Sequence, residues 1–401
     1  MALVLSGRAT ADRLSQVRAI ASPYRFSAVR WHARQYAELL CPLEIPEEAR
    51  IEPAAFVVAY FARLEAYRAL EETPEADVVE EADALERLRP AVESILASQV
   101  REAFRAEGIY GPADRLLGIP VSFPPVWFAL EAPPHILVIS PREEIASLHQ
   151  EVLEQTIALA SIEEIEGEIE GLGLSALVTE IGGIAATYPA IVSDRSSLRY
   201  AIETVAEEWL HQYLAFTPLG WHYVLHLLGV RDDYEVAQIN ESLAGLVRDE
   251  IAAAVWSRHY TELVPQASGE PDDGAFDYRA YMRETRLEAE RLLAAGAIDG
   301  AEEYMEIRRQ GLLQQGYAIR KLNQAYFAFH GTYADAPGST TPIGDELRAL
   351  RATCPSLSAY LNLAVGIRSR SDLLDLLTER GAGLALRPRA GSLGAIALPA
   401  P

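Results

Sequence analysis

Residues 203–214 read ETVAEEWLHQYL and place two adjacent glutamates and one histidine at helical spacing. Glu207 and His211 are four residues apart, so a helix puts both side chains on one face, within reach of one atom. Glu208 lies about 100° further round the helix axis. Carboxylate and imidazole groups at this spacing can bind a metal ion, and a neighbouring glutamate can take a proton from water. The stretch could therefore form a metal site with an unusual ligand, or it could be an ordinary helix that carries charged side chains.

The segment that carries these residues is predicted to be a buried helix from residue 196 to about residue 216. Ser196 or Ser197 is a suitable N-cap, and Pro218 follows the end of the pattern. Apolar residues cover nearly the whole circumference, which is typical of an interior helix. Buried carboxylates are costly without a counter-charge, so these glutamates need a cation, a base or a proton. The structural alternative is that arginines from elsewhere pair with them and that His211 is an ordinary buried histidine.

A second predicted helix, DYEVAQINESLAGLVRDEIAAAV, carries Glu241, 30 residues beyond His211. Glu241 shares its face with the small residues Ala237, Ala244 and Gly245. Small residues allow another helix to approach closely. The carboxylate of Glu241 could therefore complete a three-ligand metal site.

The two helices together resemble the gluzincin metallopeptidases, the group of thermolysin and the zinc aminopeptidases. In that family an H-E-x-x-H helix is followed by a helix bearing N-E-x-x-A or N-E-x-x-S, and here Asn240 and Glu241 begin such a motif. The later stretch LNQAYFAFHGTYADAPGSTTPIGDELRALRATCPSLSAYL is similar to the tail of bacterial zinc aminopeptidase-like proteins. The similar parts cover roughly residues 175–375.

The resemblance implies a role for each matching residue of the first two motifs. His211 and Glu241 would be metal ligands, and Glu208 would be the general base. Glu207 stands where the family has its first histidine, and would be the third ligand. The metal would be Zn²⁺ or another divalent ion, and two carboxylates favour oxygen-preferring ions such as Mn²⁺ more than two histidines would.

The resemblance of the stretch from residue 322 onward adds Asn323 and Tyr333, which match the asparagine and the tyrosine of the family's tail. Hydrolysis needs a donor where negative charge develops, and Tyr333 or His330 is expected to face the cleft for this purpose. The alternative for AYFAFHGTY is an aromatic-rich core helix.

Three other patterns in the sequence could also carry a site. His222 and His226 also have metal-ligand spacing, although Pro218 and the following Leu and Gly interrupt the helix before them. Glu208-x-x-His211 matches the di-iron motif of ferritin-like bundles, but such a bundle needs the motif twice and no second E-x-x-H occurs. The Gly182-Gly183 stretch is expected to form either an edge strand that binds an extended peptide or an ordinary core sheet.

Composition limits the partners and the location. The formal net charge is −23, and Lys321 is the single lysine, so nucleic acid is not an expected partner. Residues 209–230 lack charged side chains other than histidine but contain Pro218, and they are predicted to form a helix end and a loop rather than a membrane span. The N-terminal apolar run is too short for a signal peptide, and Cys41 and Cys354 form no disulfide framework. A cytoplasmic location is the expectation.

The fold is expected to be a predominantly helical α+β chain, with a small β-sheet packed against a helical, zincin-like second half. Four regions are predicted: a helical region at 1–110, a mixed region at 111–195, a helical metallopeptidase-like region at 196–380 and a disordered tail at 381–401. Within the mixed region we expect strands at 120–130 and 135–140, a helix from 142 to about 171, and a strand pair around Gly182 and Gly183.

The function expected from the sequence is metal-dependent hydrolysis of peptide bonds by an activated water. The partner would then be a peptide substrate. The alternative is a catalytically inactive relative of these peptidases that binds peptides or a protein partner.

Overall fold

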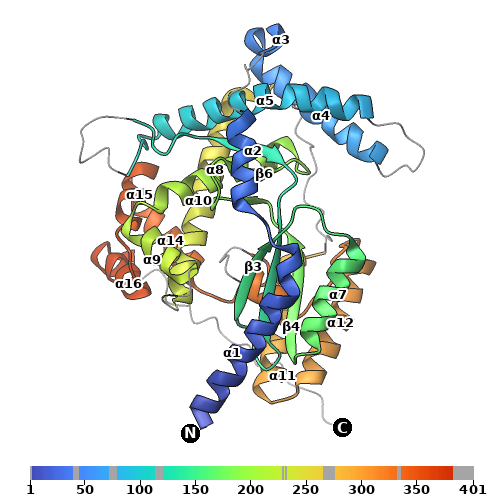
Figure 1. Ribbon diagram of the computed structural model, residues 1–401. Helices are drawn as coiled ribbons and strands as arrows, with labels where there is room; N and C mark the ends of the chain where they lie inside the picture. The colour runs from blue at the N-terminus through green and yellow to red at the C-terminus, as the bar shows by residue number, and fades with distance from the viewer. Residues whose placement is uncertain are drawn as a thin grey trace, which may run out of the picture.

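The computed structural model describes residues 2–38, 45–71, 79–112, 121–227, 230, 233–264, 276–331 and 336–382. Over these residues the protein is a predominantly helical α+β structure with small sheets (Figure 1). This confirms the predicted fold class. Residues 383–401, almost all of the predicted disordered tail, lie outside the described residues. Tyr333, in an earlier segment, also lies outside them.

The described strands form two separate three-stranded sheets rather than the single sheet expected. The upper sheet in Figure 1 has the order β1-β6-β5, with β1 parallel to β6 and β5 antiparallel to it. The lower sheet is antiparallel, with the order β3-β2-β4. The strand bounds are β1 (Phe128–Glu131), β2 (His135–Pro141), β3 (His149–Leu153), β4 (Leu174–Glu180), β5 (Gly183–Ile184) and β6 (Ala190–Ser193).

The N-terminal region is helical, as expected. Figure 1 shows α4 and α5 crossing the top of the molecule, while α1 begins at the bottom and runs upward beside the lower sheet. The elements are α1 (Ala2–Ala21), η1 (Ser22–Tyr24), α2 (Ala28–Glu38), α3 (Glu47–Ile51), α4 (Pro53–Glu71) and α5 (Val79–Ala106).

The second half of the chain is also helical, and it forms most of the main hydrophobic core together with α4, α5, β1 and β6. A smaller core joins the lower sheet to α1 and α7. The helices are α7 (Leu159–Glu170), α8 (Leu198–Leu214), α9 (Pro218–Leu227), α10 (Tyr234–His259), α11 (Tyr278–Ala294), α12 (Ile298–Gln314), α13 (Gln324–His330), α14 (Ile343–Ala352), α15 (Leu357–Ala364) and α16 (Arg370–Glu379).

Several local predictions were wrong for identifiable reasons. The helix expected from residue 142 begins only at Leu159, because residues 149–153 pair with the buried strand β2 and this long-range pairing overrides local preference. The strand expected at 120–130 is restricted to β1, since consecutive prolines at 124 and 125 have no N–H to donate to a ladder. The strand expected at 135–140 is confirmed as β2.

Two further segments near the site also differ from expectation. Gly183 belongs to β5, which pairs with β6, while the preceding strand β4 joins the other sheet. The segment after Pro218 is the helix α9 rather than a loop. Proline is well suited to the first position of a helix, and Thr217 accepts the first N–H of the turn from Trp221 on its carbonyl. None of the helices in the described part of the chain is long and apolar enough to cross a membrane.

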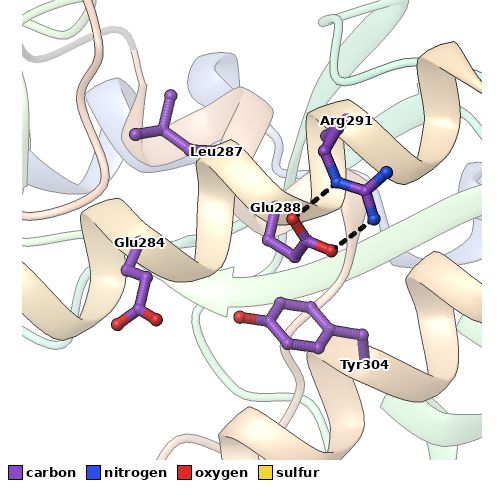
Figure 2. A pocket seen from close by; sticks show the side chains of 5 residues that line it. All are labelled: Glu284, Leu287, Glu288, Arg291 and Tyr304. Carbon is purple, nitrogen blue, oxygen red and sulfur yellow. Dashed lines mark hydrogen bonds and ion pairs between the residues drawn. The ribbon is translucent and has the colours of Figure 1, made fainter. Parts of the chain in front are cut away.

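A shallow groove on α11 and α12, with a volume of about 640 Å³, lies on neither α8 nor α10 (Figure 2). Most of the side chains that line it are charged, and two of these, Glu288 and Arg291, already pair with each other. The groove is lined by Glu284, Leu287, Glu288, Arg291 and Tyr304. It offers no convergent set of unpaired polar groups, so it is poorly suited to hold a substrate or a metal ion.

A buried carboxylate ties the segment before α13 to the lower sheet. Glu166 is 3% exposed and accepts two hydrogen bonds from Arg320, at 2.6 and 2.9 Å, and one from Lys321 at 3.0 Å. It also accepts the backbone N–H of Val178 in β4 at 2.7 Å. Burial raises the pKa of Glu166, but its bonds to Arg320 and the backbone outweigh burial and leave the pKa below its ordinary value of 4.5.

We predict that Glu166→Gln lowers the free energy of unfolding at pH 7 by about 2–3 kcal/mol, because it removes the charge that Arg320 and Lys321 share. The folded-state pKa is depressed, so this stabilisation is present above pH 4.5 and is lost as the pH falls below it. Urea unfolding at several pH values measures the difference. Glu170→Gln, at an exposed partner of Lys321, is the control and should cost less than about 1 kcal/mol. Equal losses of unfolding free energy for both variants would contradict the stabilising role of Glu166.

Candidate metal centre

Two capped helices, α8 and α10, position the predicted ligands. The side chain of Ser197 accepts the N–H of Tyr200 at the start of α8, as the serine N-cap predicted. Asp233 accepts the N–H of Val236 at the start of α10. The α8 helix is buried along most of its length, which confirms the predicted interior helix.

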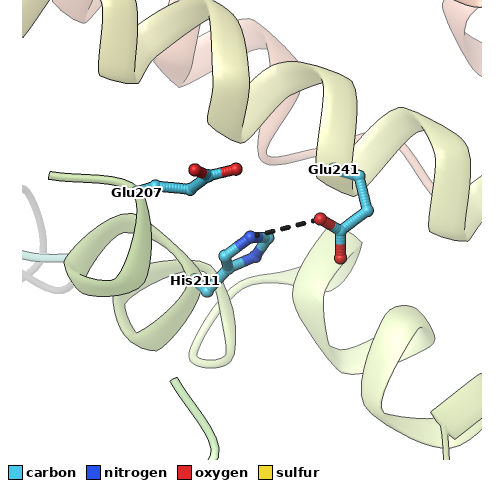
Figure 3. Close-up of side chains that lie close together, drawn as sticks. All are labelled: Glu207, His211 and Glu241. Carbon is cyan, nitrogen blue, oxygen red and sulfur yellow. Dashed lines mark ion pairs between the residues drawn. The ribbon is translucent and has the colours of Figure 1, made fainter. Parts of the chain in front are cut away.

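The structure brings Glu207, His211 and Glu241 together (Figure 3). Each offers a ligand atom, and the three atoms lie within 4.8 Å of one another. His211 Nε2 is 3.5 Å from Glu241 Oε2, and both side chains are almost completely buried. Among the described residues this is the one group of three such side chains able to share a metal ion. Two carboxylates and one imidazole are suitable ligands for a divalent cation.

Neighbouring side chains orient the imidazole and the carboxylate of Glu241. Asn240 Oδ1 lies 3.0 Å from His211 Nδ1, so the tautomer with the proton on Nδ1 leaves Nε2 facing Glu241. The Tyr223 hydroxyl donates to Glu241 Oε1, and its ring stacks on the His211 ring with centroids 6.1 Å apart. Tyr223 was missed from the sequence, because its segment was expected to be a loop.

Glu207 has a different environment, which includes a partner that was not predicted. Arg248 Nη1 donates to Glu207 Oε2 at 2.9 Å. The other carboxylate oxygen, Oε1, is buried and has no hydrogen-bond partner among the described residues. Burial raises the pKa of Glu207, opposed by Arg248 and His211. One oxygen of this carboxylate therefore remains available inside the site.

Glu208 lies on another side of α8, against the strand β5. It is 8% exposed, and a Cβ atom added at Gly183 would lie 2.4 Å from its Oε1 atom. Burial raises the pKa of Glu208 to about 8; the positive charge of His211 opposes the rise, and the charges of Glu207 and Glu241 add to it. Without a bound cation, Glu208 is therefore mostly protonated at neutral pH.

The same charges act on His211 in the opposite direction. Burial lowers the pKa of His211, but the negative charge of Glu241, with smaller contributions from Glu208 and Glu207, outweighs burial and raises it to about 10. Without a metal ion, His211 is thus an imidazolium paired with Glu241. A metal ligand must be the neutral imidazole, so binding of a cation here would release a proton.

His330 does not belong to the ligand group found among the described residues, and Tyr333 lies outside those residues. His330 ends α13 and packs on Tyr326 and Phe329, with ring centroids 4.2 and 5.1 Å away. His330 is only partly buried, but burial lowers its pKa to about 4, so its imidazole is neutral at pH 7. Asn323 caps α13 by accepting the N–H of Tyr326 and donates to Ala176 in β4, which gives it a structural role.

The competing metal patterns are not assembled either. His226 accepts the backbone N–H of Asp233 at 3.1 Å and so helps to hold the start of α10. Neither His222 nor His226 belongs to the ligand group found among the described residues. A di-iron centre would need a second E-x-x-H, which the chain lacks.

We predict that Gly183→Ala disturbs the contact between β5 and α8, because the new methyl group would overlap Glu208 and would also lie 2.6 Å from Thr204 Cγ2. The expected cost is about 1–3 kcal/mol in the free energy of unfolding. Gly167→Ala is the control, since a Cβ atom there meets nothing within 4 Å and should be neutral or slightly stabilising. Denaturant unfolding that found both variants equal to the wild type would contradict this packing.

Comparison with protein-family models, with curated proteins and with solved structures finds no match for this chain. The functional assignment therefore depends on the side chains of α8, α9 and α10 and on their surroundings.

Proposed function

We propose that the chain is a metal-dependent hydrolase that cleaves peptide bonds, with a site related to that of the gluzincin metallopeptidases. The observation that supports the proposal is the convergence of Glu207, His211 and Glu241 from two helices, with Glu208 next to them on α8. The E-E-x-x-H and N-E-x-x-A motifs predict such a group of ligands, with a base beside it.

Three residues would hold the cation, and two others would set their orientation. Glu207 has a buried oxygen without a hydrogen-bond partner among the described residues, and His211 Nε2 and Glu241 Oε2 already face each other. Tyr223 and Asn240 fix the rotations of the carboxylate and the imidazole. A divalent cation in this position would polarise a peptide carbonyl and make a nearby water more acidic.

Glu208 would act as the proton carrier of the reaction. It would accept a proton from the attacking water and pass it to the amine that leaves when the peptide bond breaks. A carboxylate whose pKa is raised by burial is a stronger base once ionised. The positive charge of a bound cation would favour that ionised form.

The ligand set affects the choice of cation. Two carboxylates carry one more negative charge than the pair of imidazoles and single carboxylate of the H-E-x-x-H pattern. Oxygen-preferring ions such as Mn²⁺ should therefore compete better with Zn²⁺ here. The expected partner is a peptide. The acidic net charge of −23 argues against nucleic acid, and the cytoplasmic location remains a prediction.

Two observations favour a second candidate, a peptide- or protein-binding relative without catalysis. Arg248 already supplies a counter-charge to Glu207, and β5 lies directly on Glu208. A site with these contacts can be stable without a metal ion. Hydrolytic activity, rather than cation binding alone, distinguishes the two candidates.

We predict that the protein loaded with Mn²⁺ or Zn²⁺ cleaves members of a mixed peptide library, and that Glu208→Gln lowers kcat/KM by about 100-fold or more. Calorimetric titration should show that the variant still binds the cation, whereas His211→Ala should not. Glu203→Gln is the matched control, one turn earlier on α8 and paired with Arg199 instead of the site. Cation binding without cleavage in the wild type would select the binding role, and absence of cation binding would refute the proposal.

A further inference from the structure

Arg248 lies in a position that the ligand motifs do not explain. It is on α10, two helical turns beyond Glu241, and its side chain folds back across Gly245, where an added Cβ would lie 3.7 Å from Nη2. From there the guanidinium reaches Glu207 Oε2 at 2.9 Å. The contacts of Glu207 with Arg248 and of His211 with Glu241 show that α8 and α10 run antiparallel at the site.

The charges of these residues form a simple sum. A site of two neutral imidazoles and one carboxylate has a net charge of −1. Replacement of one imidazole by Glu207 changes this to −2, and the guanidinium of Arg248 returns it to −1. The Glu207–Arg248 pair thus carries the same net charge as the neutral ligand that it replaces.

The pair occupies only part of the carboxylate. Arg248 binds Glu207 Oε2, while Oε1 is buried and has no hydrogen-bond partner among the described residues. Arg248 also has a second acidic partner outside the site, because it contacts the exposed Asp249 at 2.9 Å. A cation that approached Oε1 would therefore meet a fixed positive charge on the far side of the same carboxylate.

We infer that Arg248 sets the cation affinity of this site. Its guanidinium, bound to Glu207, is a fixed positive charge that weakens the binding of divalent ions to that carboxylate. The inference rests on the proposed cation site. Its physical basis is that two positive charges sharing one buried carboxylate repel each other strongly, because few water molecules screen them. Positions 207 and 248 consequently act as one unit, and replacement of either residue alone leaves the charge unbalanced.

The test is a calorimetric titration of Mn²⁺ and Zn²⁺ into the wild type, Arg248→Met and Arg248→Gln. Removal of the guanidinium charge should tighten binding of both ions by about tenfold or more. In the presence of chelator, Arg248→Met should unfold at a lower temperature than the wild type, since Glu207 loses its counter-charge. Added cation should replace that charge and remove the difference in unfolding temperature. The glutamine of Arg248→Gln can still donate a hydrogen bond to Glu207, so this variant should fold better than Arg248→Met. It tests the effect of the guanidinium charge on cation affinity while a hydrogen bond to Glu207 is kept.

Two further variants complete the design. Arg199→Met removes a guanidinium from α8 that pairs with Glu203, and its cation affinity should stay within about twofold of the wild type. Glu207→His should bind Zn²⁺ more weakly than the double variant Glu207→His/Arg248→Met, because the single change leaves an uncompensated guanidinium beside the new imidazole.

Unchanged or weaker cation binding in both Arg248 variants would overturn the inference while leaving the proposed cation site intact. Binding to the Arg248 variants but not to the wild type would support the inference and refute a metal-dependent activity of the natural chain. Absence of binding in every variant would overturn both.

Discussion

Three carboxylates are buried in the contact between α8 and α10, and the surrounding structure compensates their charge. Glu207, Glu208 and Glu241 are all largely removed from water, which strongly disfavours three adjacent negative charges. The negative charge of each carboxylate is compensated or avoided in a different way. Glu207 pairs with Arg248, and Glu241 pairs with His211. Burial raises the pKa of Glu208 to about 8, so this carboxyl group is mostly neutral at pH 7 without a bound metal cation. A divalent cation would allow all three to be ionised at once.

Contacts from other elements hold this arrangement in place. The helix α9 contributes Tyr223, whose hydroxyl bonds Glu241 and whose ring covers His211. The upper sheet contributes Gly183, where the absence of a side chain allows the backbone of β5 to lie on Glu208. Gln212 of α8 donates to the carbonyl of Thr187 at 2.9 Å and so fixes the loop after β5. The site is therefore a product of three helices and a strand edge.

The helices that carry the ligands could be predicted from sequence, because a serine cap and a nearly continuous apolar surface identify α8. The spacing of Glu207 and His211 predicted that they share one face. The approach of Glu241 could be inferred only from a family resemblance and the small residues around it, since spacing within one helix does not show which other helix it meets.

The contacts made by α9 and Arg248 show where sequence reasoning failed. Pro218 was interpreted as a helix breaker, although proline is equally suited to begin a helix, and Tyr223 was consequently overlooked. Arg248 had a detectable signal, because it follows Glu241 by seven residues and so lies on the same face of α10. Its pairing with Glu207 nevertheless depends on the antiparallel packing of two helices, which no local pattern specifies.

The most direct measurement of the central claim is anomalous diffraction from crystals of the wild-type protein soaked in Mn²⁺ or Zn²⁺. We predict one anomalous peak between Glu207, His211 and Glu241, about 2.0–2.3 Å from an oxygen or nitrogen of each side chain. Crystals without a peak at this position, in which His211 remains paired with Glu241 and Arg248 with Glu207 at high cation concentration, would contradict a cation site here.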